Sequence, residues 1–113
     1  MPVHKSKIND TATVFAALGD PNRLAMVIRL CGDGPLPTVR LKEATNFSRQ
    51  AVTKHLSLLE KCGLLTSERA GRDRLWKVQP HRLEETRKYL DKISAEWDST
   101  LKRLQRFVEE GGR

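Results

Sequence analysis

The chain contains 113 residues, of which 21 are Lys or Arg and 14 are Asp or Glu, giving a formal net charge of +7. This length accommodates one domain of ordinary size. Hydrophobic residues make up 38% of the chain and charged residues 31%, which is typical of a globular protein with a small core. The sequence lacks a run of about 18 apolar residues, which excludes a transmembrane helix, and its N-terminus lacks the apolar stretch of a secretory signal. We therefore expect a cytoplasmic protein without a membrane partner.

The first third of the sequence predicts two helices. Hydrophobic residues recur at helical spacing over residues 8–18, and Gly19 is suited to end that helix. Asp20 and Pro21 are typical of the start of a second helix, because Asp accepts hydrogen bonds from free amides and Pro has no amide to satisfy. Residues 32–35 interrupt this helix. Its predicted buried stripe consists of Leu24, Val27, Ile28 and Cys31.

A helix-turn-helix pair is predicted over about residues 38–62. Thr38 can cap a short helix through Ala44, and Ser48 can cap the next helix, which runs to about Cys62. At about 100° per residue, the second helix has two distinct arcs. The apolar arc comprises Ala51, Val52, Leu56, Leu58, Leu59 and Cys62. The polar arc comprises Arg49, Gln50, Thr53, Lys54, Ser57 and Lys61.

The polar arc carries side chains that suit the major groove of DNA, where Arg pairs with guanine and Gln with adenine. Residues at the N-terminus of such a helix reach base edges in helix-turn-helix proteins, which favours Ser48 and Arg49 as contacts. A solvated face of an ordinary helix is the other interpretation. His55 falls within the apolar arc, and we interpret it as a structural histidine bonded to the backbone, in preference to a phosphate or base contact or a metal ligand.

A basic hairpin is predicted directly after this helix, over about residues 64–78. Two short strands flank a turn at residues 70–73, and three arginines, Arg69, Arg72 and Arg74, surround it. We expect the tip to contact DNA, the alternative being a loop kept soluble by its charge. We assign Trp76 to core or dimer packing in preference to base stacking.

The distribution of charge agrees with a polyanionic partner. Residues 40–78 carry a net charge of +5, whereas residues 1–39 and residues 79–113 carry +1 each. A helix-turn-helix followed by a basic hairpin is the winged-helix arrangement. The predicted fold is therefore mainly α with a small β-hairpin, in the order α-α-α-α-β-β-α, as a single winged helix-turn-helix domain over residues 1–113.

A long helix is predicted over about residues 81–109, with a length of about 43 Å. Its hydrophobic residues step by three, four or seven, close to the seam of a coiled coil. Such a helix overhangs a small domain, so we expect a second copy of the chain to cover the seam, and the alternative is a helix folded back on its own domain. The expected dimer interface comprises Phe15, Leu90, Ile93, Trp97, Leu101, Leu104 and Val108.

Two segments resemble motifs of the ArsR-type (arsenic-repressor-like) regulators. They are residues 15–24, FAALGDPNRL, and residues 48–64, SRQAVTKHLSLLEKCGL, and the likeness extends over about residues 8–80. The resemblance implies a winged-helix homodimer that binds operator DNA and represses its own or a neighbouring operon. Carried over by position, it implies DNA contacts by Ser48, Arg49, Gln50, Thr53 and Lys54, with Arg72 and Arg74 in the wing.

The sequence departs from the metal-sensing members of that family. Residues 38–43, where many members carry cysteines, hold neither cysteine nor histidine, and the last helix has Asp91 and Asp98 but only His81, at its start. Zinc and softer metals need clustered thiolate or imidazole ligands. Residues 95–109 resemble a metal-independent branch, so we expect neither a metal nor a cofactor. The identity of any small-molecule inducer stays open.

The sequence also bears on three other functions. A thiol switch would use Cys31 and Cys62, but both fall on predicted apolar arcs, which favours buried, inert thiols. An enzyme is disfavoured because P-loop, GxGxxG and HExxH motifs are missing, and Ser48 and His55 lie two helical turns apart. A protein-interaction module that uses only the long helix would dimerise without binding DNA.

Overall fold

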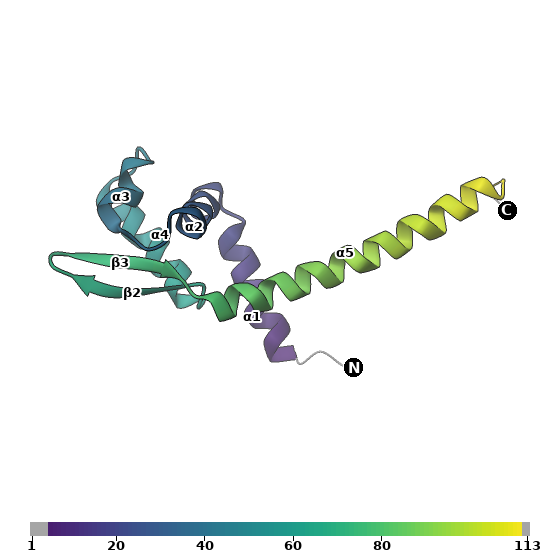
Figure 1. Cartoon of the computed structure of the whole chain (residues 1–113), viewed down its shortest axis with the longest axis horizontal. Coiled ribbons are helices and arrows are strands. Elements are labelled where there is room, and N and C mark those ends of the chain that lie inside the picture. The colour runs from purple at the N-terminus through teal and green to yellow at the C-terminus, as the bar shows by residue number, and fades with distance from the viewer. Residues whose placement is uncertain (1–4, 112–113) are drawn as a thin grey trace.

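The computed structural model describes residues 5–111, which form a globular head from which one long helix projects (Figure 1). The order of the helices and of the hairpin strands is the predicted one, and one short strand, β1, adds to it. The elements are α1 (Lys5–Leu18), α2 (Pro21–Asp33), β1 (Leu36–Pro37), α3 (Thr38–Glu43), α4 (Arg49–Lys61), β2 (Leu65–Ala70), β3 (Asp73–Val78) and α5 (Pro80–Glu109).

The helix starts follow the predicted capping signals, with one exception. The Asp20 carboxylate accepts hydrogen bonds from the amides of Asn22 and Arg23 at the start of α2. The Ser48 hydroxyl accepts one from the amide of Ala51 at the start of α4. Thr38 was predicted to cap α3, and this is wrong. Its hydroxyl instead accepts a hydrogen bond from the buried indole Nε1 of Trp76 at 2.9 Å.

The strands form one antiparallel sheet in the order β1-β3-β2. β2 and β3 are joined by a two-residue turn, and Gly71 in that turn has φ of +64°, a value that glycine adopts without steric cost. At the other end of β2, Gly63 has φ of +86° and reverses the chain after α4. The basic hairpin is thereby tied closely to the end of α4.

The core of the head packs α1, α2, α3 and α4 against the inner face of the sheet. Trp76 on β3 is only 1% exposed and packs in the core, one of the two packing roles predicted for it. Val52, Leu56 and Leu59 of the predicted apolar arc are fully buried, but Leu58 is 42% exposed. Leu58 faces outward because only a narrow strip of α4 meets the other helices.

The predicted buried stripe of α2 is largely wrong. Val27 is buried as expected, whereas Leu24, Ile28 and Cys31 are exposed, Ile28 by 62%. The residues that pack inward are Met26, Val27 and Leu30. Apolar residues occupy two sides of this helix, so periodicity alone could not tell which side faces the core.

α5 contacts the head only near its own N-terminus, where it crosses α1 (Figure 1). Of the helices in residues 5–111, none is both long and apolar enough to cross a membrane. The expectation about a secretory signal concerns the N-terminus, and residues 1–4 lie outside the described part of the chain.

Candidate nucleic-acid interface

The outer face of α4 carries every DNA contact predicted for this helix. With Val52, Leu56 and Leu59 packed against the core, the opposite side of the helix faces outward. Arg49, Gln50, Lys54 and Ser57 are exposed there and Thr53 is half-buried, and these five residues line one shallow hollow. Ser48 lies exposed at the start of the helix; its oxygen accepts from Ala51, so its O–H remains available to donate to a phosphate.

The hairpin lies beside the N-terminal part of α4. Between the two elements is a cavity of about 270 Å³, which is lined by residues of α3, α4, β2 and β3. The cavity thus brings the predicted wing residues Arg72 and Arg74 together with Arg49 and Thr53 of the polar arc. Its lining residues are Thr38, Arg49, Thr53, Arg69, Arg72, Asp73, Arg74 and Trp76.

Arg69 also lines this cationic cavity, although the family resemblance implied DNA contacts only for Arg72 and Arg74 of the wing. Arg69 and Arg74 are directly paired across β2 and β3. Like charges at paired positions of a hairpin destabilise it, so an anionic partner that neutralises them would relieve a repulsion. The signal available in the sequence was the placement of the two arginines at equal distances from the turn.

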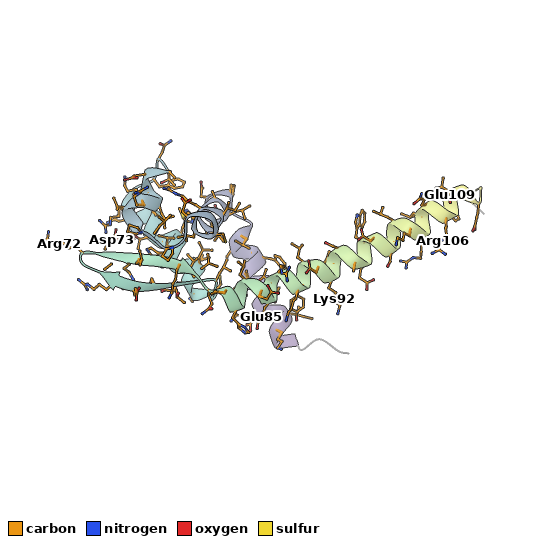
Figure 2. All side chains as sticks on the ribbon, in the orientation of Figure 1. Arg72, Asp73, Glu85, Lys92, Arg106 and Glu109 are labelled. Atoms are coloured by element: carbon orange, nitrogen blue, oxygen red, sulfur yellow. The ribbon has the colours of Figure 1, made fainter. Side chains whose placement is uncertain are left out.

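Hydrogen bonds fix the position of Arg74 relative to α4. Its Nε donates to the hydroxyl of Ser67 on β2 at 3.0 Å, and that hydroxyl donates to the carboxylate of Glu60 on α4 at 2.6 Å. Arg72 lies exposed at the tip of the hairpin, next to Asp73 (Figure 2). The wing therefore presents one arginine held against α4 and one at its outer end.

Asp73 is the acidic residue of the cavity. Its carboxylate accepts hydrogen bonds from the backbone amides of Val39 and Arg74 and pairs with a guanidinium nitrogen of Arg49 at 3.2 Å. Partial burial alone would raise the pKa of Asp73. The hydrogen bonds from Thr38 and the two amides, with the charge of Arg49, outweigh that effect and hold the pKa below its ordinary value. Asp73 is therefore ionised at neutral pH.

His55 is half-buried and connects α4 to the junction of α1 and α2. Its Nδ1 lies 3.2 Å from Nη1 of Arg23, whose Nε donates to the carbonyl of Ala17 at 2.7 Å. The expected backbone partner of His55 is thus replaced by a side-chain partner. Arginine can only donate, so Nδ1 of His55 accepts in this hydrogen bond. The ring also packs on Phe47, with centroids 5.8 Å apart.

Within the part of the chain that the structure describes, no cluster of three or more His, Cys, Asp or Glu side chains is arranged to hold a metal ion. The two cysteines differ in environment. Cys31 is exposed at the end of α2, against the expectation that it is buried. Cys62 is half-buried, and its thiol donates to the carbonyl of Leu59.

Comparisons with known proteins agree with this geometry. The chain is 35% identical over 71 residues to the HTH-type transcriptional regulator NmtR of Mycobacterium tuberculosis, covering 63% of this chain but only 58% of that protein. It is 32% identical over 98 residues to the HTH-type transcriptional regulator Rv2034 of the same organism, covering 87% of this chain and 88% of that one.

A solved structure is similar over nearly the whole fold. The ArsR-like transcriptional regulator from Rhodococcus sp. RHA1 superposes with a TM-score of 0.70 at 33% sequence identity, covering 90% of this chain and 95% of that chain. No family model matches the sequence. The likeness confirms the predicted winged helix-turn-helix fold, with its mostly helical head and small antiparallel sheet.

Proposed function

The chain belongs to the ArsR/SmtB family of winged helix-turn-helix transcriptional regulators, and on that premise we propose that it represses transcription as a homodimer bound to operator DNA in the cytoplasm. The members of this family are regulators and not enzymes. The observation that carries the proposal is the position of the outer face of α4 and of the basic hairpin on either side of one cationic cavity.

In the proposed complex, α4 lies in the major groove and the hairpin follows the neighbouring backbone and minor groove. Arg49 and Gln50, at the start of α4, read base edges, while the other polar side chains of the helix contact phosphates or thymine methyl groups. The free amides of the first turn of α4 also favour a phosphate. The proposed contacts are Ser48, Arg49, Gln50, Thr53, Lys54 and Ser57 on the helix, with Arg72 and Arg74 on the wing.

The proposed dimer forms through α1 and α5. Along α5, hydrophobic side chains remain exposed on one stripe of the helix, and Trp97 is 59% exposed. At about 25 cal/mol per Å² of apolar surface, covering this stripe gives a favourable contribution to association. Phe15 on α1 is half-buried and extends the apolar surface to the head. The proposed interface residues are Phe15, Leu90, Ile93, Trp97, Leu101, Leu104 and Val108.

We propose further that this repressor responds to a signal other than a metal ion. The described side chains offer four histidine or cysteine positions, and no three of them cluster with each other or with carboxylates: Cys31 on α2, His55 on α4, Cys62 at the end of α4 and His81 on α5. Borderline and soft metals require such ligands to cluster. Chelator should therefore leave operator binding unchanged.

A thiol-responsive repressor is the second candidate, and the exposure of Cys31 favours it. An exposed thiol is accessible to an oxidant or a persulfide, whereas a buried one is not. If this candidate is right, oxidant releases the wild-type protein from DNA and leaves Cys31→Ser bound. Equal release of both proteins would dismiss Cys31 as the sensor.

DNA binding by purified protein across a salt series tests the proposal. Affinity for every duplex should fall with salt, because phosphate contacts release counterions. Arg72→Ala should lower the slope of log K against log salt by about 0.9 and weaken binding to all sequences alike. Gln50→Ala should keep the slope and lose about 1–3 kcal/mol of discrimination between sequences. Full discrimination by Gln50→Ala would refute the base-reading role.

A further inference from the structure

A carboxylate in the middle of a surface that binds DNA opposes binding, because it repels the phosphates. Asp73 occupies that position: it lines the same cavity as Arg49, Arg69, Arg72 and Arg74. Its side chain is 19% exposed, so the charge is directed into the cavity wall more than toward solvent. The contacts of this carboxylate show what compensates for the repulsion.

Two backbone amides fix the position of the Asp73 carboxylate. Its Oδ2 accepts from the amide of Val39 at 3.2 Å, and Oδ1 accepts from the amide of Arg74 at 2.7 Å. Val39 is the second residue of α3, a helix whose own N-cap residue, Pro37, has no side chain that can accept. Asp73 on the wing therefore serves as the cap of α3. The adjoining Thr38 is fixed by its hydrogen bond to the buried indole of Trp76.

Arg49 is the more exposed partner in this arrangement. Its side chain is 56% exposed at the first position of α4, and Nη2 lies 3.2 Å from Oδ1 of Asp73. A guanidinium has five N–H donors in a rigid plane, so the contact with Asp73 leaves most donors available while restricting the direction of the plane. A long side chain that is already oriented loses less entropy when it binds.

We propose that Asp73 is a specificity-determining positioning residue, which orients Arg49 for a base edge and keeps it from pairing with the DNA backbone. This inference rests on the proposed function. Without the carboxylate, the Arg49 guanidinium is free to turn to the nearest phosphate, which is present in every sequence. Binding to unrelated DNA then tightens while discrimination is lost.

The substitution Asp73→Asn separates this role from a purely structural one. Asn keeps one acceptor oxygen, which can still accept from the amide of Val39, so the cap of α3 is kept. Its NH2 group takes the place of Oδ1, so the hydrogen bond from the amide of Arg74 and the ion pair with Arg49 are removed. Glu68→Gln is the matched control, because Glu68 is exposed on β2 of the same wing and loses the same charge.

The experiment begins with selection of duplexes from a randomised DNA pool by the wild-type protein. Affinities of each variant are then measured for the enriched duplex and for a shuffled duplex of equal composition. Asp73→Asn and Glu68→Gln, which each remove one negative charge, should both bind the shuffled duplex more tightly than the wild type does. Only Asp73→Asn should lose discrimination, by about tenfold, the loss expected when one bidentate base contact is misplaced. Thermal unfolding checks that both variants remain folded.

A double-mutant cycle shows whether Asp73 acts through Arg49. In an Arg49→Ala background, Asp73→Asn should cause no further loss of discrimination. Equal discrimination by Asp73→Asn, Glu68→Gln and the wild type would overturn the inference while leaving the proposed function intact. An equal additional loss in the Arg49→Ala background would also overturn it. Failure of the wild type to enrich any sequence would overturn the proposed function and the inference with it.

Discussion

The head and the projecting part of α5 use hydrophobic residues in opposite ways. In the described chain, the buried hydrophobic core lies entirely between Val14 and Trp76, within the head. Along α5 from Leu90 to Glu109, every side chain is exposed except that of Thr100, which is half-buried. Both regions have hydrophobic residues at helical spacing, but only the head buries such residues within one chain.

This difference assigns the two proposed functions, DNA recognition and dimerisation, to different regions of the chain. The head builds its own core and can hold α4 and the hairpin in fixed positions, which sequence recognition requires. The projecting helix (Figure 1) leaves its apolar stripe exposed, and in the proposed dimer a second copy covers that stripe and sets the distance between the two heads. Variants of each region should therefore affect different measurements.

The largest expected effect is on assembly. Trp97→Glu places a carboxylate in the proposed apolar interface, where an unpaired charge costs about 3–5 kcal/mol, so the dimer should weaken about 100-fold or more. Sedimentation equilibrium measures this, and the helical signal of the head should persist. Ser99→Glu adds the same charge on about the opposite side of the helix and should leave the dimer intact. Equal dimerisation of both variants would show that this stripe is not the interface.

A smaller effect is expected on folding of the head. Leu56 is fully buried, so Leu56→Ala should lower the free energy of unfolding by about 2–5 kcal/mol. Leu104→Ala removes the same atoms from an exposed position and should leave unfolding of the dilute monomer almost unchanged. Urea unfolding at low protein concentration measures both. A comparable loss in the two variants would contradict the separation between head and projecting helix.

The smallest expected effect is the dependence of the head on pH. The amides of Asn22 and Arg23 lower the pKa of Asp20, and the contacts of Asp73 lower its pKa as well, both from an ordinary value of 3.8. A lowered pKa in the folded state contributes stability that is complete above the unfolded value and is lost as pH falls below it. Urea unfolding should therefore show declining stability below about pH 4, and a smaller decline in Asp73→Asn. An identical decline would contradict the contribution of Asp73.

Local signals in the sequence predicted much of the fold. Asp20 and Ser48 cap their helices because the capping hydrogen bonds join residues two or three positions apart, and the hairpin turn depends on the four residues around Gly71. The polar arc of α4 was predictable for the same reason, since one helix determines which side chains share a face. The family resemblance added the order of these parts and their winged-helix arrangement.

Features that depend on distant residues escaped prediction. β1 forms only because Leu36 pairs with Trp76 on β3. The hydroxyl of Thr38 does not cap α3 as predicted, because it accepts a hydrogen bond from the indole of Trp76. The pair between Arg49 on α4 and Asp73 on β3 likewise joins two residues that are 24 positions apart in the sequence. The buried side of α2 was predicted wrongly because apolar residues occupy two sides of the helix, and only contacts with neighbouring elements select the side that is buried.

The most direct test of the account is the stoichiometry and spacing of the DNA complex. The wild-type protein first enriches a duplex from a randomised pool. The mass of the complex with that duplex gives the number of chains bound, and the sequence of the duplex gives the spacing of the half-sites. We predict two chains per duplex and an inverted repeat whose half-sites are centred about 10–10.5 base pairs, or a multiple of that distance, apart. A complex with one chain per duplex, or an enriched sequence without repeated half-sites, would contradict the account of two heads placed by paired α5 helices.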